Sequence, residues 1–316
     1  MARLAPAATA VMVLAAVVSV AAGLQAINVT SISFEEGYAP LFGHDNILRS
    51  ADDRTVSLLL DRTTGSGFIS SAMYQHGLFS ASIKLPSDYT AGTNVYGNGS
   101  VSRGREERYV LPFDPTTEFH RYSILWTPSS VAFYVDDVPV REVRRSPAMG
   151  GDFPSKPMSL YATVWDASNW ATSGGKYKVN YRYGPFVASF TDLALAGCRV
   201  DQPGIRMMTM MPPDGEVIES FRRCAAAEER LRAADVAVMT LEKQQAMRRF
   251  REQYMVYSYC YDTLRYPVPF PECDVSWSRS GGGSRTPATS GSRSGGGSSG
   301  GEAAGPWWDA GTGAGM

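Results

Sequence analysis

The feature that most constrains this chain is a series of short segments in which apolar and polar residues alternate, from about residue 27 to residue 198. In residues 131–143 (VAFYVDDVPVREV), apolar residues take every second position on both sides of Asp136-Asp137. This pattern predicts a β-hairpin that turns at the two aspartates. Similar patterns occupy residues 68–85, 121–126 and 186–195. Many short strands separated by glycine and proline favour an antiparallel sandwich or barrel over β-α-β units.

Two finer expectations concern turns and helices. Residues 68–85 alternate around His76-Gly77, where the sequence predicts a turn. After Cys198 the pattern changes, and a helix is predicted from Leu241 to about Tyr257, with the hydroxyl of Thr240 as its N-cap. Its apolar and aromatic face is expected to comprise Met247, Phe250, Tyr254 and Tyr257.

The two ends of the chain differ in composition from its centre. Arg3 precedes an apolar run from about residue 7 to residue 22, which fits a cleavable signal peptide over residues 1–22. The alternative is a membrane anchor, but the run is at the short end of the ~20 residues that a span needs. We therefore expect a secreted protein that has no membrane segment after cleavage. Residues 278–316 are rich in glycine and serine and are expected to form a flexible tail.

Charge and cysteine content exclude several classes. The net charge of −1 argues against nucleic-acid binding. Three histidines and four cysteines are too few and too scattered to suggest a metal site, and nothing indicates a cofactor. In an oxidising compartment, Cys198, Cys224, Cys260 and Cys273 predict two disulfides with three possible connectivities, of which the pairing of neighbours closes the shortest loops. Asn28 and Asn98 begin glycosylation sequons.

Residues 165–170 (WDASNW) combine flat aromatic rings with short hydrogen-bonding side chains. A sugar presents an apolar CH face and a rim of hydroxyl groups, so this combination is typical of carbohydrate binding. The alternative is that Trp165 and Trp170 belong to the hydrophobic core. Composition alone does not separate the two interpretations.

A family resemblance favours the carbohydrate. It is carried by residues 74–86 (YQHGLFSASIKLP), 94–97 (NVYG), 113–116 (FDPT), 120–126 (HRYSILW), 165–172 (WDASNWAT) and 260–267 (CYDTLRYP). These motifs, in this order, resemble the xyloglucan endotransglucosylase/hydrolases, which are plant cell-wall enzymes of glycoside hydrolase family 16. The likeness extends from about Phe34 to Cys273.

The resemblance implies a jelly-roll β-sandwich of the concanavalin-like type, with a disulfide-bonded C-terminal extension that contains one helix. It also implies the pairing of neighbouring cysteines, a glycan at Asn98, and xyloglucan polysaccharide or oligosaccharides as the partner. The residues that match glucan-contacting positions of the family are Thr93, Asn94, Arg105, Glu106, Asn169, Trp170, Gly174 and Arg265.

The chain departs from the family at its catalytic strand. The family motif H-D-E-x-D-F-E-F supplies a nucleophile, an assisting aspartate and an acid/base from one face of a strand, and a retaining mechanism needs two such carboxylates. No Glu-x-Asp-x-Glu occurs in the 316 residues. Residues 89–92 are followed at once by Thr93, where the family has two or three further strands. We therefore expect no catalytic residues.

The sequence thus predicts four parts: a signal peptide over 1–22, a family 16 sandwich over 23–197 with a segment deleted between residues 92 and 93, an extension over 198–277 and a tail over 278–316. The inherited activity is the cleavage and religation of xyloglucan in the cell wall and apoplast, and the chain as written is expected to be inactive. Two alternatives are a xyloglucan-binding wall protein without catalysis and a truncated product of a splicing or gene-assembly fault.

Overall fold

The computed structural model describes residues 29–86, 104–169, 175–200, 222, 224–229, 231 and 238–273. Its strands are β1 (Tyr38–Phe42), β2 (Ile47–Arg49), β3 (Val56–Leu60), β4 (Ser66–Ser70), β5 (Met73–Lys84), β6 (Glu107–Tyr109), β7 (His120–Trp126), β8 (Ser130–Val135), β9 (Val138–Arg144), β10 (Tyr161–Val164), β11 (Phe186–Val200) and β12 (Met255–Ser258). The helices are α2 (Phe34–Gly37), η2 (His44–Asn46), η3 (Pro147–Asp152), η4 (Tyr181–Tyr183), α4 (Leu241–Tyr254) and η6 (Tyr259–Tyr261).

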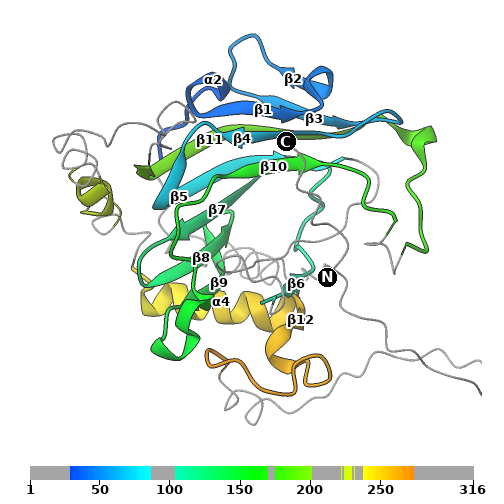
Figure 1. Cartoon of the computed structure of the whole chain (residues 1–316). Coiled ribbons are helices and arrows are strands. Elements are labelled where there is room, and N and C mark those ends of the chain that lie inside the picture. The colour runs from blue at the N-terminus through cyan, green and yellow to red at the C-terminus, as the bar shows by residue number, and fades with distance from the viewer. Residues whose placement is uncertain are drawn as a thin grey trace, which may run out of the picture.

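The strands form one large sheet and two small ones (Figure 1). The large sheet has seven antiparallel strands in the order β2-β3-β11-β5-β7-β8-β9. A three-stranded sheet, β1-β4-β10, packs against one end of it, and β6 and β12 form a separate pair beside α4 and the far end. The protein is therefore a β-sandwich, and the described strands of its smaller layer form two separate pieces.

Aromatic side chains fill the space between the large sheet and the three-stranded sheet. Phe68 of β4 is buried, and its ring meets those of Phe34 and Phe190 edge-on, each at a centroid distance of 5.4 Å. Val56 and Leu58 of β3 belong to the same cluster. Alternation along each strand directs these side chains into a common core, so this end of the sandwich is closely packed.

The inner face of the large sheet is less well covered at its other end. On β7, Leu125 points away from the three-stranded sheet and is only 2% exposed, because it packs with Tyr134 and Leu231. The neighbouring Ile124 and its cross-strand partner Phe133 point inward and are only partly buried. In a sandwich the inner face normally holds the most buried residues, so burial is reversed at Ile124 and Phe133, although Phe79 and Trp126 on the same face are buried.

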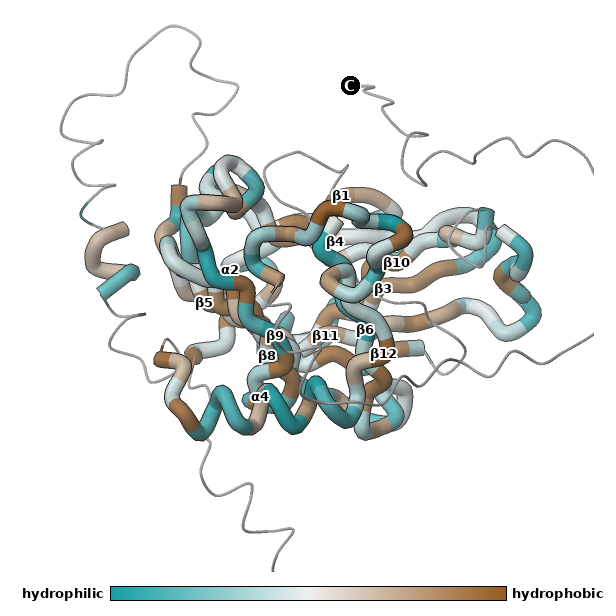
Figure 2. The backbone as a smooth tube through the Cα atoms, turned by 90° about the horizontal axis from the view of Figure 1, so that it is seen from below, coloured by the Kyte–Doolittle hydropathy of each residue, from teal (hydrophilic) through white to brown (hydrophobic). Residues whose placement is uncertain are grey.

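Helix α4 lies along the far edge of the large sheet, next to β9 (Figure 2). Its N-cap is Thr240, whose hydroxyl accepts a hydrogen bond from the backbone N–H of Lys243, as the sequence predicted. Hydrophilic residues line most of its turns, and Phe250 is its buried anchor against Val135 and Val140. Of the helices that the structure describes, none has the length and apolar character to span a bilayer.

The predicted all-β sandwich is confirmed, and so is the hairpin. Asp136 and Asp137 join β8 to β9 with φ values of 47° and 63°, the conformation of a two-residue turn with left-handed residues. The predicted helix ends too late, however. Helix α4 stops at Tyr254, and Tyr257 lies on β12.

The predicted turn at His76-Gly77 is wrong. The chain reverses between β4 and β5 at Ser71-Ala72, and His76-Gly77 lies within β5. Glycine suits this position because β11 approaches closely: a Cβ on Gly77 would lie 3.0 Å from the carbonyl oxygen of Ala196, and 2.5 Å from the ring of Phe79 on its own strand. On β11, a Cβ on Gly197 would lie 2.2 Å from the carbonyl oxygen of His76. The glycine predicts a turn by its local sequence, but in the structure it allows neighbouring strands of the sheet to pack closely.

The reversed burial predicts unequal costs for two neighbouring truncations. Leu125→Ala is expected to lower the free energy of unfolding by about 2–5 kcal/mol, because it empties a fully buried site. Ile124→Ala is expected to cost less than half as much, because part of that side chain already contacts water. Urea denaturation of the two variants checks this, and a larger loss for Ile124→Ala would show that the inner face is fully covered in solution.

Candidate functional site

The two small strands β6 and β12 present two chemically different faces. The N–H of Tyr259 donates to the carbonyl oxygen of Glu106 at 3.0 Å, which aligns the start of β6 with the end of β12. Since successive side chains on a strand point to opposite sides, Glu106 and Arg108 share one face and Glu107 and Tyr109 share the other. We call the first face the β6–β12 patch; it comprises Glu106, Arg108, Tyr257, Asp262 and Arg265.

Glu107 is buried at the centre of an ion-pair network. Its carboxylate accepts hydrogen bonds from both terminal nitrogens of Arg251, at 2.6 and 2.8 Å, and from the hydroxyl of Tyr109 at 2.6 Å. Nε of Arg141 lies 3.3 Å away, and the hydroxyl of Ser258 donates at 3.2 Å. These partners come from α4, β6, β9 and β12. One carboxylate therefore connects four elements.

The pKa of Glu107 follows from this environment. Burial alone would raise it, but the hydrogen bonds from Arg251 and the charges of Arg141 and Arg251 outweigh the burial, so the pKa lies below its usual range. Glu107 is therefore ionised at neutral pH. A carboxyl group held in this state is unsuited to act as a general acid, which must carry a proton before it reacts.

Arg105 is also buried, at 6% exposure. It forms ion pairs with Glu272 and with Asp152, the latter at 3.0 Å, and its guanidinium lies 5.0 Å from the ring centroid of Phe270. Its carbonyl oxygen accepts a hydrogen bond from Arg141 at 2.7 Å. In the structure, Arg105 therefore anchors the loop closed by the Cys260–Cys273 disulfide.

The β6–β12 patch holds charges and an aromatic ring close together. Glu106 pairs with Arg108 at 2.5 Å and with Arg265 at 3.4 Å. The guanidinium of Arg108 lies 5.1 Å from the ring centroid of Tyr257. Asp262 accepts hydrogen bonds from the hydroxyl of Tyr257 at 2.8 Å and from the backbone N–H of Arg265 at 3.0 Å.

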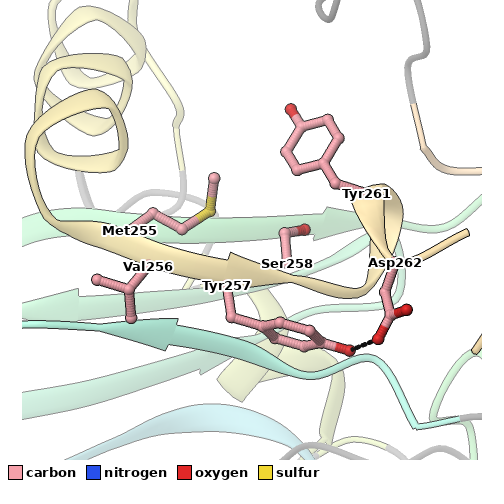
Figure 3. A pocket seen from close by; sticks show the side chains of 6 residues that line it. All are labelled: Met255, Val256, Tyr257, Ser258, Tyr261 and Asp262. Carbon is pink, nitrogen blue, oxygen red and sulfur yellow. Dashed lines mark hydrogen bonds between the residues drawn. The ribbon is translucent and has the colours of Figure 1, made fainter. Parts of the chain in front are cut away.

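An open pocket of about 370 Å³ adjoins this patch. Figure 3 shows the hydrogen bond between Tyr257 and Asp262 in its wall. The residues that line it are Met255, Val256, Tyr257, Ser258, Tyr261 and Asp262. Flat rings beside carboxylate and guanidinium groups can contact both the CH face and the hydroxyl groups of a sugar.

The loop after β10 holds Asn169. The amide oxygen of Asn169 accepts a hydrogen bond from Nζ of Lys178 at 2.9 Å, and Lys178 also donates to the carbonyl oxygen of Ser168 at 3.0 Å. Trp165, at the start of the loop, is 51% exposed. The alternative that Trp165 belongs to the core is therefore wrong, because β10 ends at Val164 and the chain leaves the sheet there.

The structure brings Arg105, Glu106 and Arg265 together around β6, and Asn169 lies after β10. The other predicted contacts, Thr93, Asn94, Trp170 and Gly174, and both sequon asparagines, Asn28 and Asn98, lie outside the described residues. Sequence reasoning missed Tyr257 and Asp262 as members of the patch. Tyr257 continues the helical spacing of the residues before it, so the sequence predicted it on the helix and not on a strand. Within the described ranges, no group of three or more histidine, cysteine or acidic side chains could hold a metal ion.

Two family models match this chain, one in the sandwich and one in the C-terminal part. The family model of glycosyl hydrolases family 16 matches residues 87–183, and that of the xyloglucan endo-transglycosylase C-terminus matches residues 227–273. The probable xyloglucan endotransglucosylase/hydrolase protein 30 of Arabidopsis thaliana is 51% identical over 284 residues, covering 78% of this chain and 79% of the relative. The chain belongs to the xyloglucan endotransglucosylase/hydrolase family.

A second relative gives a similar result. Probable xyloglucan endotransglucosylase/hydrolase protein 29 of the same plant is 50% identical over 286 residues, covering 78% of this chain and 79% of the relative. A solved structure of Crh5 transglycosylase in complex with NAG is 20% identical with a TM-score of 0.42, covering 55% of this chain and 84% of that chain. The two disulfides, Cys198–Cys224 and Cys260–Cys273, confirm the neighbour pairing that the family resemblance implied.

The Glu107 network predicts a large stability difference between two adjacent glutamates. Glu107→Gln is expected to lower the free energy of unfolding by about 3–5 kcal/mol, because it leaves buried arginines without their counter-charge. Glu106→Gln serves as the matched control and is expected to cost at most about 1 kcal/mol, since Arg108 is well exposed. Urea denaturation at neutral pH measures both, and equal losses would contradict the assignment of Glu107 as the central charge.

The lowered pKa of Glu107 also predicts a pH dependence. Because the folded-state pKa lies below the ordinary value of 4.5, the unfolded chain binds a proton that the folded chain does not. The stabilisation is complete above that ordinary value and is lost as the pH falls through the folded-state pKa. The free energy of unfolding, measured by urea denaturation at several values between pH 7 and pH 3, is expected to fall more steeply with decreasing pH for the native chain than for Glu107→Gln. The same pH dependence in both proteins would contradict this.

Proposed function

We propose that this chain is a secreted, xyloglucan-binding member of its family that performs neither transglucosylation nor hydrolysis. The observation that carries the proposal is the absence of any Glu-x-Asp-x-Glu from the sequence. A retaining enzyme needs one carboxylate to form the glycosyl intermediate and a second carboxyl group to protonate the departing oxygen. Neither group is supplied by a motif of the chain.

The alignment with the relatives supports a missing internal segment. It extends over 284 positions with the first relative, whereas 78% of the 316 residues is about 246 residues. About 38 aligned positions therefore have no residue of this chain opposite them. A gap of this size matches the two or three strands, at ~5–6 residues each plus their turns, that the sequence lacks between residues 92 and 93.

The acidic residues around β6 do not replace the lost pair. Glu106 and Glu107 are adjacent, so their side chains point to opposite faces of the strand and cannot flank one glycosidic bond. Each also carries a structural ion pair, Glu106 with Arg265 and Glu107 with Arg251. Both glutamates therefore stabilise the folded structure. Neither is available as the general acid or the nucleophile of a glycosyl transfer.

Binding is the property that the remaining residues support. The β6–β12 patch offers a tyrosine ring, two carboxylates and two guanidinium groups within one small area. Asn169 adds an amide from the loop after β10. We assign further contacts with xyloglucan to Thr93, Asn94, Trp170 and Gly174, by the match of their motifs to the family. Arg105 matches the same motif, but it is buried and paired with Glu272 and Asp152, so we assign it to holding the fold.

The same proposal places the protein in the cell wall and apoplast. It comprises a signal peptide over residues 1–22, a sandwich over 23–197, an extension over 198–277 and a tail over 278–316, with glycans at Asn28 and Asn98. The apolar run before residue 23 and the two disulfides, which persist in oxidising compartments, support secretion.

An activity assay tests the catalytic half of the proposal. Purified chain is incubated with xyloglucan and a labelled xyloglucan oligosaccharide, and both the label in the polymer and the polymer size are measured. Neither is expected to change relative to a heat-inactivated control, because a lost covalent route is not replaced by the roughly 10²–10⁴-fold that proton transfer supplies. Incorporation of label or shortening of the polymer above the control would refute it.

A binding assay tests the other half. Arg265→Ala is expected to weaken xyloglucan binding by about tenfold, since hydrogen bonds to charged groups contribute most at such sites. Arg249→Ala, on the exposed side of α4, is the control and should bind like the native chain. Mobility in gels containing xyloglucan measures both. If the native chain itself is not retarded, the protein is not a xyloglucan binder, which would favour a truncated product without function.

A further inference from the structure

Two charged side chains hold the loop that follows β10. Asp166 accepts a hydrogen bond from the backbone N–H of Ser168 at 2.8 Å through one oxygen, and from the hydroxyl of Tyr181 at 2.7 Å through the other. Nζ of Lys178 donates to the carbonyl oxygen of Ser168 at 3.0 Å and to Oδ1 of Asn169 at 2.9 Å. A carboxylate and an ammonium group therefore fix the same short segment.

Asp166 keeps its negative charge in this position. Burial would raise the pKa of its carboxyl group, but the hydrogen bonds from Ser168 and Tyr181 and the charge of Lys178 outweigh burial, so the pKa lies below its usual range. Tyr181 belongs to η4, and its ring lies 6.4 Å from that of Phe186 at the start of β11. The carboxylate therefore connects the loop to the large sheet and attracts the ammonium group.

Gly175 returns the chain to Asn169. Its φ of 85° is left-handed, a conformation that glycine adopts without strain. A Cβ at this position would lie 2.4 Å from the carbonyl oxygen of Asn169, so a larger residue would push the two segments apart. The described residues on either side of residues 170–174 are therefore in contact. This contact keeps Lys178 close to the amide with which it bonds.

The ammonium group of Lys178 determines which way the Asn169 amide faces. An ammonium group has donors and no acceptor, so it can bond only to the amide oxygen. The N–H bonds of the amide therefore lie on the side of the group away from Lys178. Asn169 is exposed, and its amide nitrogen donates no hydrogen bond in the part of the chain that the structure describes. It presents donors outward, and the hydroxyl and ring oxygens of a sugar are suitable acceptors.

We propose that Lys178 is a positioning residue for carbohydrate binding, which holds the Asn169 amide so that its N–H groups donate to an acceptor oxygen of the sugar. This inference rests on the proposed binding of xyloglucan and adds a donor role for Asn169 and an indirect role for Lys178. An amide fixed before binding removes the cost of ordering that side chain when the sugar arrives. The alternative is that Lys178 only closes the loop.

Binding of a xyloglucan oligosaccharide to the full chain, measured by calorimetry, tests the role of Lys178. Lys178→Met keeps the aliphatic stem and removes the donors, and it is expected to weaken binding about two- to tenfold, the cost of ordering one released side chain. Lys178→Arg restores N–H donors and is expected to restore binding. Lys176→Met is the matched control, because that ammonium group lies over the ring of Tyr177, 5.5 Å from its centroid, and it should bind like the native chain.

A double-mutant cycle separates positioning from loop closure. Asn169→Ala removes the amide and is expected to weaken binding about three- to tenfold, the contribution of a neutral hydrogen bond. In the Asn169→Ala background, Lys178→Met is expected to cause no further loss, since an indirect role disappears with the group through which it acts. Normal binding by Lys178→Met, or an equal loss from Lys178→Met in both backgrounds, would overturn the proposal.

Nuclear magnetic resonance of the Asn169 side chain gives a readout that needs no ligand. In isotopically labelled protein, its NH₂ signals are identified by their absence from Asn169→Ala. They are expected to shift in Lys178→Met and to return toward their native positions in Lys178→Arg. Signals that stay in place in Lys178→Met would overturn the orientation of the amide. A native chain that binds no xyloglucan would refute the proposed function and the sugar contact with it, while the NH₂ signals still decide the orientation.

Discussion

The ion pairs of buried Glu107 hold together a part of the protein that backbone hydrogen bonding does not join to the rest of its layer. β6 and β12 pair only with each other among the described strands, and β10, the nearest strand of the same layer, belongs to a different sheet. Side chains provide the attachment, because Arg251 of α4 and Arg141 of β9 converge on one carboxylate. Breaking a buried ion pair is costly because the remaining charge has no solvent, so the C-terminal extension and the large sheet depend on this contact.

The sequence predicted the elements whose signals are local. The Asp136-Asp137 turn needs two residues with positive φ and is flanked by clear alternation, and Thr240 is an ordinary N-cap. The predictions that were wrong concern residues whose conformation depends on contacts with residues distant in the sequence. Gly77 is small because β11 approaches it, and Tyr257 leaves its helical spacing because β12 pairs with β6. Neither partner is visible in a local window. Family motifs identified Glu106 and Arg265 as candidate residues, but only the structure shows that they form an ion pair.

Catalysis and binding depend on different parts of such a sandwich. The chemistry requires carboxylates at alternate positions of one strand, so losing that strand removes every one of them at once. The recognition proposed here is distributed over several elements, and the residues assigned to it on β12, in the loop after β10 and in the disulfide-closed loop are present. The proposed loss of activity and the proposed retention of binding are thus compatible with one and the same change in the sequence.

The central claim is that this chain binds xyloglucan without forming a bond to it. Mass spectrometry of the intact protein, after incubation with xyloglucan oligosaccharides and rapid acid quenching, tests this most directly. A retaining enzyme accumulates or passes through a glycosyl-enzyme whose mass includes the donor fragment. The account predicts that the protein mass is unchanged at every time point. A species heavier by one glycosyl fragment would contradict it.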